Sequence, residues 1–192
     1  MFSELQGKRY GAIYADPPWL FETWGKENPA SRAPKYQRSN IDELAAFPVA
    51  DLCKDDSVLF MWIMWPLLPD ALKLVSAWGF TYKTCAFSWV KAHASQMKLF
   101  GDDYDVQVGL GYWTRSNNEV CLLATRGHPK RINADVRQAI VEPRREHSRK
   151  PDCVYERIER LVAGPYLELF ARTRREGWDS WGNEIDKFEE VS

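Results

Sequence analysis

The chain has 192 residues, of which 45% are hydrophobic and 28% are charged, as in an ordinary globular domain. A chain of this length is long enough for one domain that buries about 70% of its unfolded surface. The formal net charge is −1, so a nucleic-acid site must come from a local cluster of basic residues and not from the overall charge.

The cysteines lie far apart and lack the paired spacing of a metal site: Cys53, Cys85, Cys121 and Cys153. Reduced thiols and no bound metal are therefore expected. The first residues lack the apolar stretch of a signal peptide, and no apolar run is long enough to cross a bilayer. Since repeats and low-complexity linkers are also missing, we expect one cytoplasmic domain over residues 1–192 with no membrane partner.

The chain begins with a strand-like run over residues 10–15, which ends at Asp16-Pro17-Pro18-Trp19. Two consecutive prolines cannot continue a strand or a helix, so the strand must open into a loop here. Glycine, proline and charged residues then dominate residues 24–40, a composition that predicts a surface loop.

The next four elements alternate between helix and strand. Residues 41–52 are expected to form a short helix capped by Asn40. Residues 57–65 are an uninterrupted apolar run, typical of a strand buried on both faces. Helical spacing over residues 67–78 stops at a glycine, and the β-branched and aromatic residues 80–90 predict another strand.

Residues 91–118 have no clear period and many charges, which indicates a long functional or interface loop. Strands are expected at residues 119–125 and 139–142. A helix with proline in its first turn is expected over residues 151–162, and a last buried strand over residues 166–170.

This alternation predicts an α/β domain in which helices cover both faces of a parallel or mostly parallel sheet. Ligands bind beyond the carboxyl ends of the strands in such folds. The Asp16–Trp19 turn and the residues after Phe170 both lie at such ends.

The Asp-Pro-Pro-Trp turn has the chemistry needed to activate an aromatic amine. The lone pair of an adenine amino group is delocalised into the ring, so two acceptors must grip its N–H bonds before the nitrogen can attack. Asp16 offers a carboxylate oxygen and Pro17 a backbone carbonyl, while neither Pro17 nor Pro18 has a competing N–H. Trp19 offers a flat face on which an extruded base can stack. The structural alternative is a proline-rich turn with an aspartate cap and a buried tryptophan.

The run from Ala15 to Trp19 resembles the catalytic motif of the amino-group methyltransferases. Its tryptophan form near the start of the chain is similar to the family of the catalytic subunit of the mRNA adenine methyltransferase and its bacterial and phage relatives. Weaker matches follow in order along the chain: Phe60-Met61-Trp62, Trp78-Gly79-Phe80, Trp89-Val90-Lys91, residues 148–152, Ile158-Glu159-Arg160-Leu161, Glu168-Leu169-Phe170 with Arg172, and Gly182-Asn183.

The resemblance implies a permuted Rossmann-like methyltransferase in which the catalytic loop precedes the cofactor-binding strand. It implies S-adenosylmethionine as the cofactor and a target-amine site made of Asp16, Pro17, Pro18 and Trp19. By the same resemblance, Lys150 holds the methionine carboxylate of the cofactor, and Arg172 and Asn183 lie around its ribose and adenine. The remaining cofactor-binding residues that it implies are Asp16, Glu168, Phe170 and Glu184.

Two departures from the family concern the adenosine pocket. Relatives with longer N-termini have an acidic cofactor contact upstream of the catalytic strand, for which this chain has no counterpart. Residues 173–178 form a shorter segment than in relatives and carry Arg174 and Arg175.

One segment of the chain is strongly basic. Residues 126–150 contain eight Lys or Arg against three Asp or Glu, a local charge of +5 before histidines are counted. A basic segment beside a catalytic loop fits a phosphate-binding rim, although a solvated charged loop is an equal alternative. The candidate phosphate contacts are Lys130, Arg131, Arg144, Arg145 and Arg149.

The expected activity is methylation of the N6 amino group of adenine in nucleic acid. DNA is favoured over RNA by analogy with bacterial and phage relatives, which are bare catalytic domains. The alternatives are RNA methylation, methylation of a protein side-chain amide, and a non-catalytic nucleic-acid-binding subunit. Residues 91–118 place Tyr104, Leu110, Tyr112 and Trp113 among charges, a mixture suited to an interface. The resemblance implies that this segment pairs with a second subunit, so a homodimer is expected.

Overall fold

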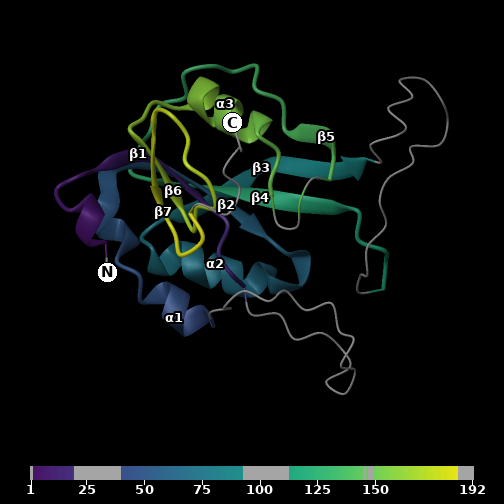
Figure 1. Ribbon diagram of the computed structural model, residues 1–192, viewed down its shortest axis with the longest axis horizontal. Helices are drawn as coiled ribbons and strands as arrows, with labels where there is room; N and C mark the ends of the chain where they lie inside the picture. The colour runs from purple at the N-terminus through teal and green to yellow at the C-terminus, as the bar shows by residue number, and fades with distance from the viewer. Residues whose placement is uncertain (1, 20–39, 93–112, 145, 147–148, 186–192) are drawn as a thin grey trace.

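The computed structural model describes residues 2–19, 40–92, 113–144, 146 and 149–185. These residues form a seven-stranded sheet with the order β5-β3-β4-β2-β1-β6-β7 (Figure 1). Its strands are β1 (Tyr10–Ala15), β2 (Cys53–Ile63), β3 (Thr81–Ala92), β4 (Asn118–Arg126), β5 (Ala139–Pro143), β6 (Tyr166–Leu169) and β7 (Trp178–Trp181). The helices are α1 (Ile41–Ala45), α2 (Leu68–Ala77) and α3 (Cys153–Leu161), with 3-10 turns at η1 (Ser3–Leu5), η2 (Val49–Leu52) and η3 (Trp65–Leu67).

The sheet is mostly parallel. Strand β4 runs antiparallel to both of its neighbours, β2 and β3, and the other neighbouring pairs of the described sheet are parallel. The carboxyl ends of β1, β2, β3 and β6 therefore meet at one edge, and the amino end of β4 lies at the same edge. This edge contains the Asp16–Trp19 turn.

Two hydrophobic cores lie on opposite faces of the sheet. Along β2, Leu59, Met61 and Ile63 pack into the core that also contains buried residues of α1 and α2. The alternate residues of that strand, including Trp62, pack into the core that contains α3. Figure 1 shows α1 and α2 on one side of the sheet and α3 on the other. The predicted α/β fold, Rossmann-like with helices on both faces, is confirmed.

The predicted helix over residues 41–52 is wrong in its extent. Asn40 caps α1 as expected, since its side chain accepts a hydrogen bond from the backbone of Glu43, which reciprocates with its carboxylate. The helix ends at Ala45, however, and a separate 3-10 turn, η2, begins after Pro48. Proline cannot donate the backbone hydrogen bond that a continuous helix would need at this point.

Two strand predictions also need correction. Strand β2 begins at Cys53 and not at residue 57, and its pairing with β1 is irregular between Cys53 and Val58, where the exposed charged residues 54–56 lie. The predicted series ended with β6, but β7 adds a further parallel strand beside it. Trp178 of β7 is buried and stacks on Tyr166 with ring centroids 4.8 Å apart.

Two predicted loops fall largely outside the described residues: the one over residues 24–40 and the one over residues 91–118. Among the described helices, none has the length and apolar character that a membrane span requires.

Candidate active site

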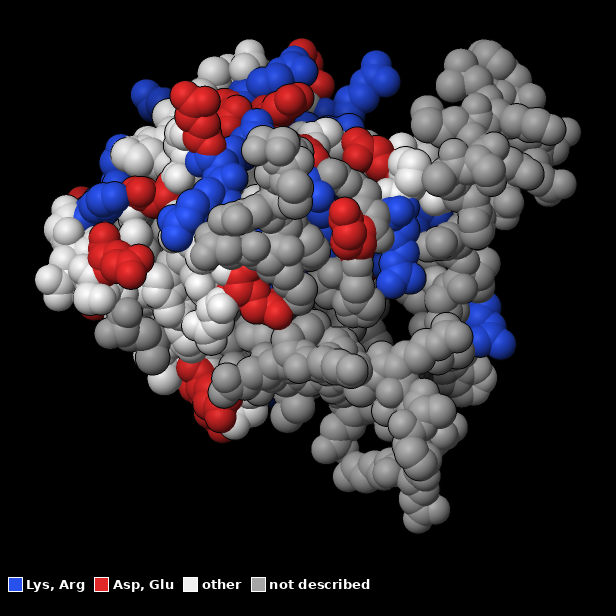
Figure 2. All heavy atoms as spheres, viewed as in Figure 1, with Lys and Arg blue, Asp and Glu red and all other residues white. Residues whose placement is uncertain are grey.

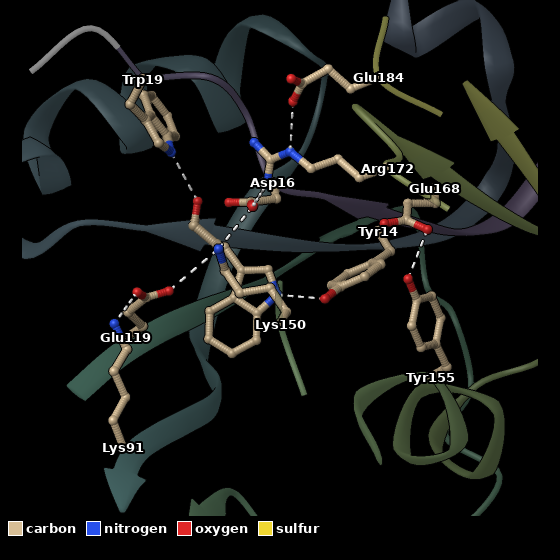
Figure 3. A network of polar contacts seen from close by, with 11 residues as sticks. Tyr14, Asp16, Trp19, Lys91, Glu119, Lys150, Tyr155, Glu168, Arg172 and Glu184 are labelled. Atoms are coloured by element: carbon tan, nitrogen blue, oxygen red, sulfur yellow. Dashed lines mark hydrogen bonds and ion pairs between the residues drawn. The ribbon is translucent and has the colours of Figure 1, made fainter. Parts of the chain in front are cut away.

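The Asp16–Trp19 turn leaves the carboxyl end of β1 and is fixed to the neighbouring strand β2. The backbone N–H of Trp19 donates to the carbonyl of Pro17 at 2.8 Å, which closes the turn. The indole Nε1 of Trp19 donates to the backbone carbonyl of Trp62 at 3.1 Å (Figure 3). Only 8% of Trp19 is exposed, so most of its indole packs in the core and anchors the turn.

Asp16 is held by two cations that come from distant parts of the chain. Lys150 Nζ lies 2.8 Å and Arg172 Nη1 3.1 Å from the same carboxylate oxygen, Oδ2. All three side chains are largely buried, with 11% to 17% of each exposed. Within the described part of the chain, Oδ1 of Asp16 has no hydrogen-bond or ion-pair partner, so its lone pairs remain available to a ligand.

Glu119 extends this network on the side away from Arg172. Its carboxylate lies 3.3 Å from Lys150 Nζ and forms an ion pair with Lys91. Burial opposes ionisation of Glu119, but the two ammonium groups outweigh it and lower the pKa of Glu119 to about 2. Burial likewise disfavours the Lys150 ammonium, yet the carboxylates of Asp16 and Glu119 raise the pKa of Lys150 above its usual value. Both groups are therefore charged at neutral pH.

A cleft of about 300 Å³ opens over this network. This volume is at the lower end of the range of ligand pockets and suits a single base rather than a stacked pair. Its wall combines aromatic rings with charged groups: Asp16, Pro17, Trp19, Trp62, Ile63, Met64, Trp89, Lys91, Glu119, Arg144, Glu146, Arg149, Lys150 and Arg172. A flat ring can therefore lie against apolar surface while its polar edge meets Asp16.

A second, smaller cavity of about 30 Å³ adjoins the cleft, because both are lined by Asp16, Arg149, Lys150 and Arg172. Glu168, at the end of β6, lines the small cavity and accepts a hydrogen bond of 2.9 Å from the Tyr155 hydroxyl. Burial, with a further contribution from the nearby Asp16 charge, raises the pKa of Glu168 to about 8, although the Tyr155 hydrogen bond acts in the opposite direction.

Most of the chain matches one known protein family. The model of the MT-A70 family matches residues 10–184. The chain belongs to the MT-A70 family.

Several relatives match almost the whole of this MT-A70 chain. The Type II methyltransferase M.MunI of a Mycoplasma species is 33% identical over 96% of this chain and 82% of its own length. An MT-A70-like N(6)-adenosine-methyltransferase of Arabidopsis thaliana is 30% identical over 92% of this chain. The human N(6)-adenosine-methyltransferase catalytic subunit METTL3 is 28% identical over 93% of this chain. The chain spans about a quarter of the length of these last two proteins.

As an MT-A70 methyltransferase, the protein uses S-adenosylmethionine as its cofactor. The donor set of the small cavity fits the amino-acid end of this molecule, which has one carboxylate and one ammonium group. Lys150 and Arg172 offer cationic donors there, Asp16 offers a carboxylate, and Glu168 offers a further carboxyl oxygen as an acceptor.

Other residues predicted to bind the cofactor lie around the end of β6 in the MT-A70 domain. Phe170 lines the small cavity and has a positive φ of 62°, a strained conformation of the kind that concentrates at functional sites. Glu184 accepts a hydrogen bond from Arg172 Nε at 3.2 Å. Asn183 is exposed, and it lines neither cavity among the described residues.

The structure divides the basic segment over residues 126–150. Arg144 and Arg149 line the cleft, and Arg145 lies outside the described residues. Lys130 and Arg131 follow the carboxyl end of the antiparallel strand β4, at the sheet edge opposite the Asp16–Trp19 turn. On the face shown in Figure 2, Lys and Arg side chains are mixed with Asp and Glu and do not form a uniform basic surface.

Sequence reasoning missed several residues of the site: Tyr14, Trp62, Lys91, Glu119 and Tyr155. Glu119 lies at the amino end of β4. This end lies at the sheet edge that contains the Asp16–Trp19 turn only because β4 is antiparallel. A search limited to the carboxyl ends of parallel strands could not find it. The aromatic residues resembled core residues, and most are indeed buried; their hydrogen bonds show that they also support the site.

Proposed function

We propose that this MT-A70 methyltransferase transfers the methyl group of S-adenosylmethionine to the N6 amino group of adenine in DNA. Methylation at N6 of adenine is the reaction of this family. The observation that carries the proposal is the placement of Asp16. Its Oδ1 faces no described partner, while Oδ2 is fixed by Lys150 and Arg172 at the junction of the two cavities.

Asp16 and Pro17 grip the two N–H bonds of the target amine. Oδ1 of Asp16 accepts one of them, and the carbonyl of Pro17 accepts the other. That carbonyl already accepts from the Trp19 N–H, but a carbonyl oxygen has a second lone pair. Both acceptors are fixed before the substrate binds, so little reorganisation is needed as the nitrogen becomes tetrahedral.

When bound, S-adenosylmethionine supplies an electrophilic methyl group on a sulfonium. The residues of this chain orient the amine towards it from the cleft. The methylated nitrogen is initially cationic and a strong acid, so it releases its extra proton to water without a specialised base. Asp16 stabilises the positive charge that develops on this nitrogen, because its carboxylate accepts a hydrogen bond from it.

A base that is paired and stacked in a duplex cannot reach Asp16, since the cleft accepts a single ring system. We therefore propose that the target adenine is extruded, at a cost of a few kcal/mol, or is already unpaired. Arg144 and Arg149 line the cleft and are placed to contact flanking phosphates, which compensates for this cost. Stacking on Trp19 remains part of the proposal, because this largely buried residue also lines the cleft.

The choice of DNA is supported by the relatives. The one named as a Type II methyltransferase is matched over 82% of its length, which supports the analogy with bare catalytic domains on which the choice of DNA depends. The named adenosine methyltransferases share about a quarter of theirs, and they support RNA as the second candidate.

One experiment distinguishes these substrates. The protein is supplied with S-adenosylmethionine labelled in the methyl group and with DNA and RNA oligonucleotides of matched sequence, and the products are digested to nucleosides. Label in N6-methyldeoxyadenosine supports the proposal. Label confined to N6-methyladenosine supports RNA, and label in neither nucleoside contradicts both.

The proposal also covers the domain organisation, the location and the oligomeric state of the protein. Residues 1–192 form one domain, because all described strands belong to one sheet. The protein acts in the cytoplasm as a homodimer. The fully exposed Trp113 supports the dimer; Tyr104, Leu110 and Tyr112 lie outside the described residues. A single species of monomer mass in light scattering at micromolar concentration would contradict the dimer.

A further inference from the structure

Within the described part of the chain, the buried hydroxyl of Tyr14 has no acceptor for its proton. Tyr14 belongs to β1, two residues before the catalytic Asp16, and only 1% of it is exposed. Its oxygen accepts a hydrogen bond of 2.7 Å from the indole Nε1 of Trp62. An indole N–H can only donate, so the Tyr14 oxygen must be the acceptor and its own proton must point elsewhere. Among the described residues, no acceptor for this proton lies within hydrogen-bond distance.

This donor belongs to the wall of the small cavity. Tyr14 lines that cavity together with Lys150 and Glu168. Figure 3 shows the Tyr14 hydroxyl turned towards the part of the site that Lys150 occupies. The Trp62 indole connects the two groups, because its Nε1 bonds the hydroxyl and its ring lies 5.5 Å from Lys150 Nζ. Buried polar groups almost always have a partner in a folded protein, so a donor in this position indicates a ligand or an ordered water.

We propose that Tyr14 and Lys150 together bind the α-carboxylate of the cofactor's methionine moiety. The inference rests on the proposed function, which requires S-adenosylmethionine in this cavity. A carboxylate is the sole anionic group of that molecule, and its two oxygens can accept from a cation and a hydroxyl at once. The opposite charge is provided for as well, because the Asp16 carboxylate lines the same cavity and suits the α-ammonium group.

The role of Tyr14 differs from that of the other buried tyrosine beside this cavity. Tyr155 gives its proton to Glu168 at 2.9 Å and so has an internal partner. Tyr10, on the same strand as Tyr14, gives its proton to Asp179 at 2.7 Å, near the opposite edge of the sheet. Tyr14 is therefore the hydroxyl whose proton is available to a ligand among these three tyrosines.

The test compares two ligands that differ only in the carboxylate. S-adenosylhomocysteine carries it, and S-adenosyl-3-thiopropylamine lacks it. We expect Tyr14→Phe to weaken the binding of S-adenosylhomocysteine about tenfold, as measured by isothermal titration, and to leave the amine analogue within twofold of wild type. The matched control Tyr10→Phe, on the same strand, should change neither affinity.

Tyr14→Phe also leaves the Trp62 N–H without its acceptor, which could disturb Lys150 indirectly. The comparison is therefore repeated in a Trp62→Phe background, where no indole N–H is left unpaired. The selective tenfold loss should persist there, and it also provides the test if Tyr14→Phe itself does not fold.

Four results would overturn the inference: equal losses for both ligands, no loss for either, selectivity that vanishes in the Trp62→Phe background, or a wild type that binds neither ligand. The last of these would also contradict the cofactor in the proposed function. A wild type that binds S-adenosylhomocysteine but methylates no nucleic acid would contradict the proposed substrate and leave the Tyr14 result valid.

Discussion

Replacement of Asp16 by asparagine tests the central step of the proposed mechanism. Asparagine keeps the shape of the side chain but offers one acceptor oxygen and one NH₂ donor in place of two acceptor oxygens. Lys150 and Arg172 can only donate, and both contact Oδ2 at 2.8 Å and 3.1 Å. The amide must therefore turn its oxygen towards these cations and its NH₂ towards the cleft. A donor would then face the N–H of the target amine where an acceptor is needed.

The expected cost follows from the burial of this site. Loss of one preorganised hydrogen bond to a transition state in a water-poor site costs about 3 kcal/mol or more, which corresponds to a rate reduction of roughly 150-fold. The fold should survive, because Lys150 keeps Glu119 and Arg172 keeps Glu184 as ion-pair partners. The free energy of unfolding should fall by about 1–3 kcal/mol, the usual scale for hydrogen bonds to charged groups.

The assay is the single-turnover rate of methyl transfer at saturating labelled S-adenosylmethionine, with thermal unfolding as the measure of folding. Asp179→Asn is a matched control, since this aspartate on β7 pairs with Lys8 and Tyr10 away from the cleft. It should lose stability and keep the rate. A rate for Asp16→Asn within threefold of wild type would refute the role assigned to Oδ1.

Three further predictions follow from the charged groups around the cleft. Lys150→Ala should weaken S-adenosylmethionine binding by about 1.5–3 kcal/mol in isothermal titration, because it removes a charge-assisted hydrogen bond; unchanged affinity would contradict its contact with the cofactor. Arg144→Gln should lower the slope of log affinity for nucleic acid against log salt by about 1 in fluorescence anisotropy, if this residue contacts one phosphate, whereas Lys130→Gln, at the opposite edge, should leave the slope unchanged. The pKa of Glu168 is about 8 in the folded protein and near 4.5 in the unfolded chain, so the folded state retains a proton between these values and stability must fall as pH rises through this window. The free energy of unfolding of Glu168→Gln minus that of wild type, measured with urea, should therefore be larger at pH 8 than at pH 5 by a few kcal/mol. An equal difference at both pH values would argue against burial of the protonated carboxyl.

Local signals in the sequence were enough to predict most elements of the sheet. The apolar run in β2 and the glycine after α2 each depend on a few neighbouring residues, and the structure follows both. The capping box at Asn40 is local in the same way. Strand β7 was not predictable by these means, because its four residues have no apolar alternation and are ordered by pairing with β6. Tertiary contacts decide the structure of such a short segment.

The Asp16–Trp19 turn could be singled out from the sequence because its residues are contiguous and their types are unusual. The basic segment was a weaker guide, since residues close in sequence proved to lie at opposite edges of the sheet. Lys130 follows the carboxyl end of β4, whereas Arg144 follows the carboxyl end of β5 and lines the cleft. They are separated because the antiparallel direction of β4 places its carboxyl end at the edge opposite the cleft. The residues of β4 do not indicate this direction in the sequence.

The same reversal of β4 gives the site its charge balance. It brings Glu119 to the sheet edge that contains the Asp16–Trp19 turn, where Lys150 forms ion pairs with both Glu119 and Asp16. A ligand carboxylate that draws Lys150 into the small cavity then leaves Asp16 with Arg172, and Glu119 with Lys91. Since both acids keep a partner, the lysine can turn to the cofactor without leaving a buried charge unpaired, which would otherwise cost several kcal/mol. An antiparallel strand in a mostly parallel sheet thus lets one lysine pair with two acids and, in the proposed mechanism, also bind the cofactor carboxylate.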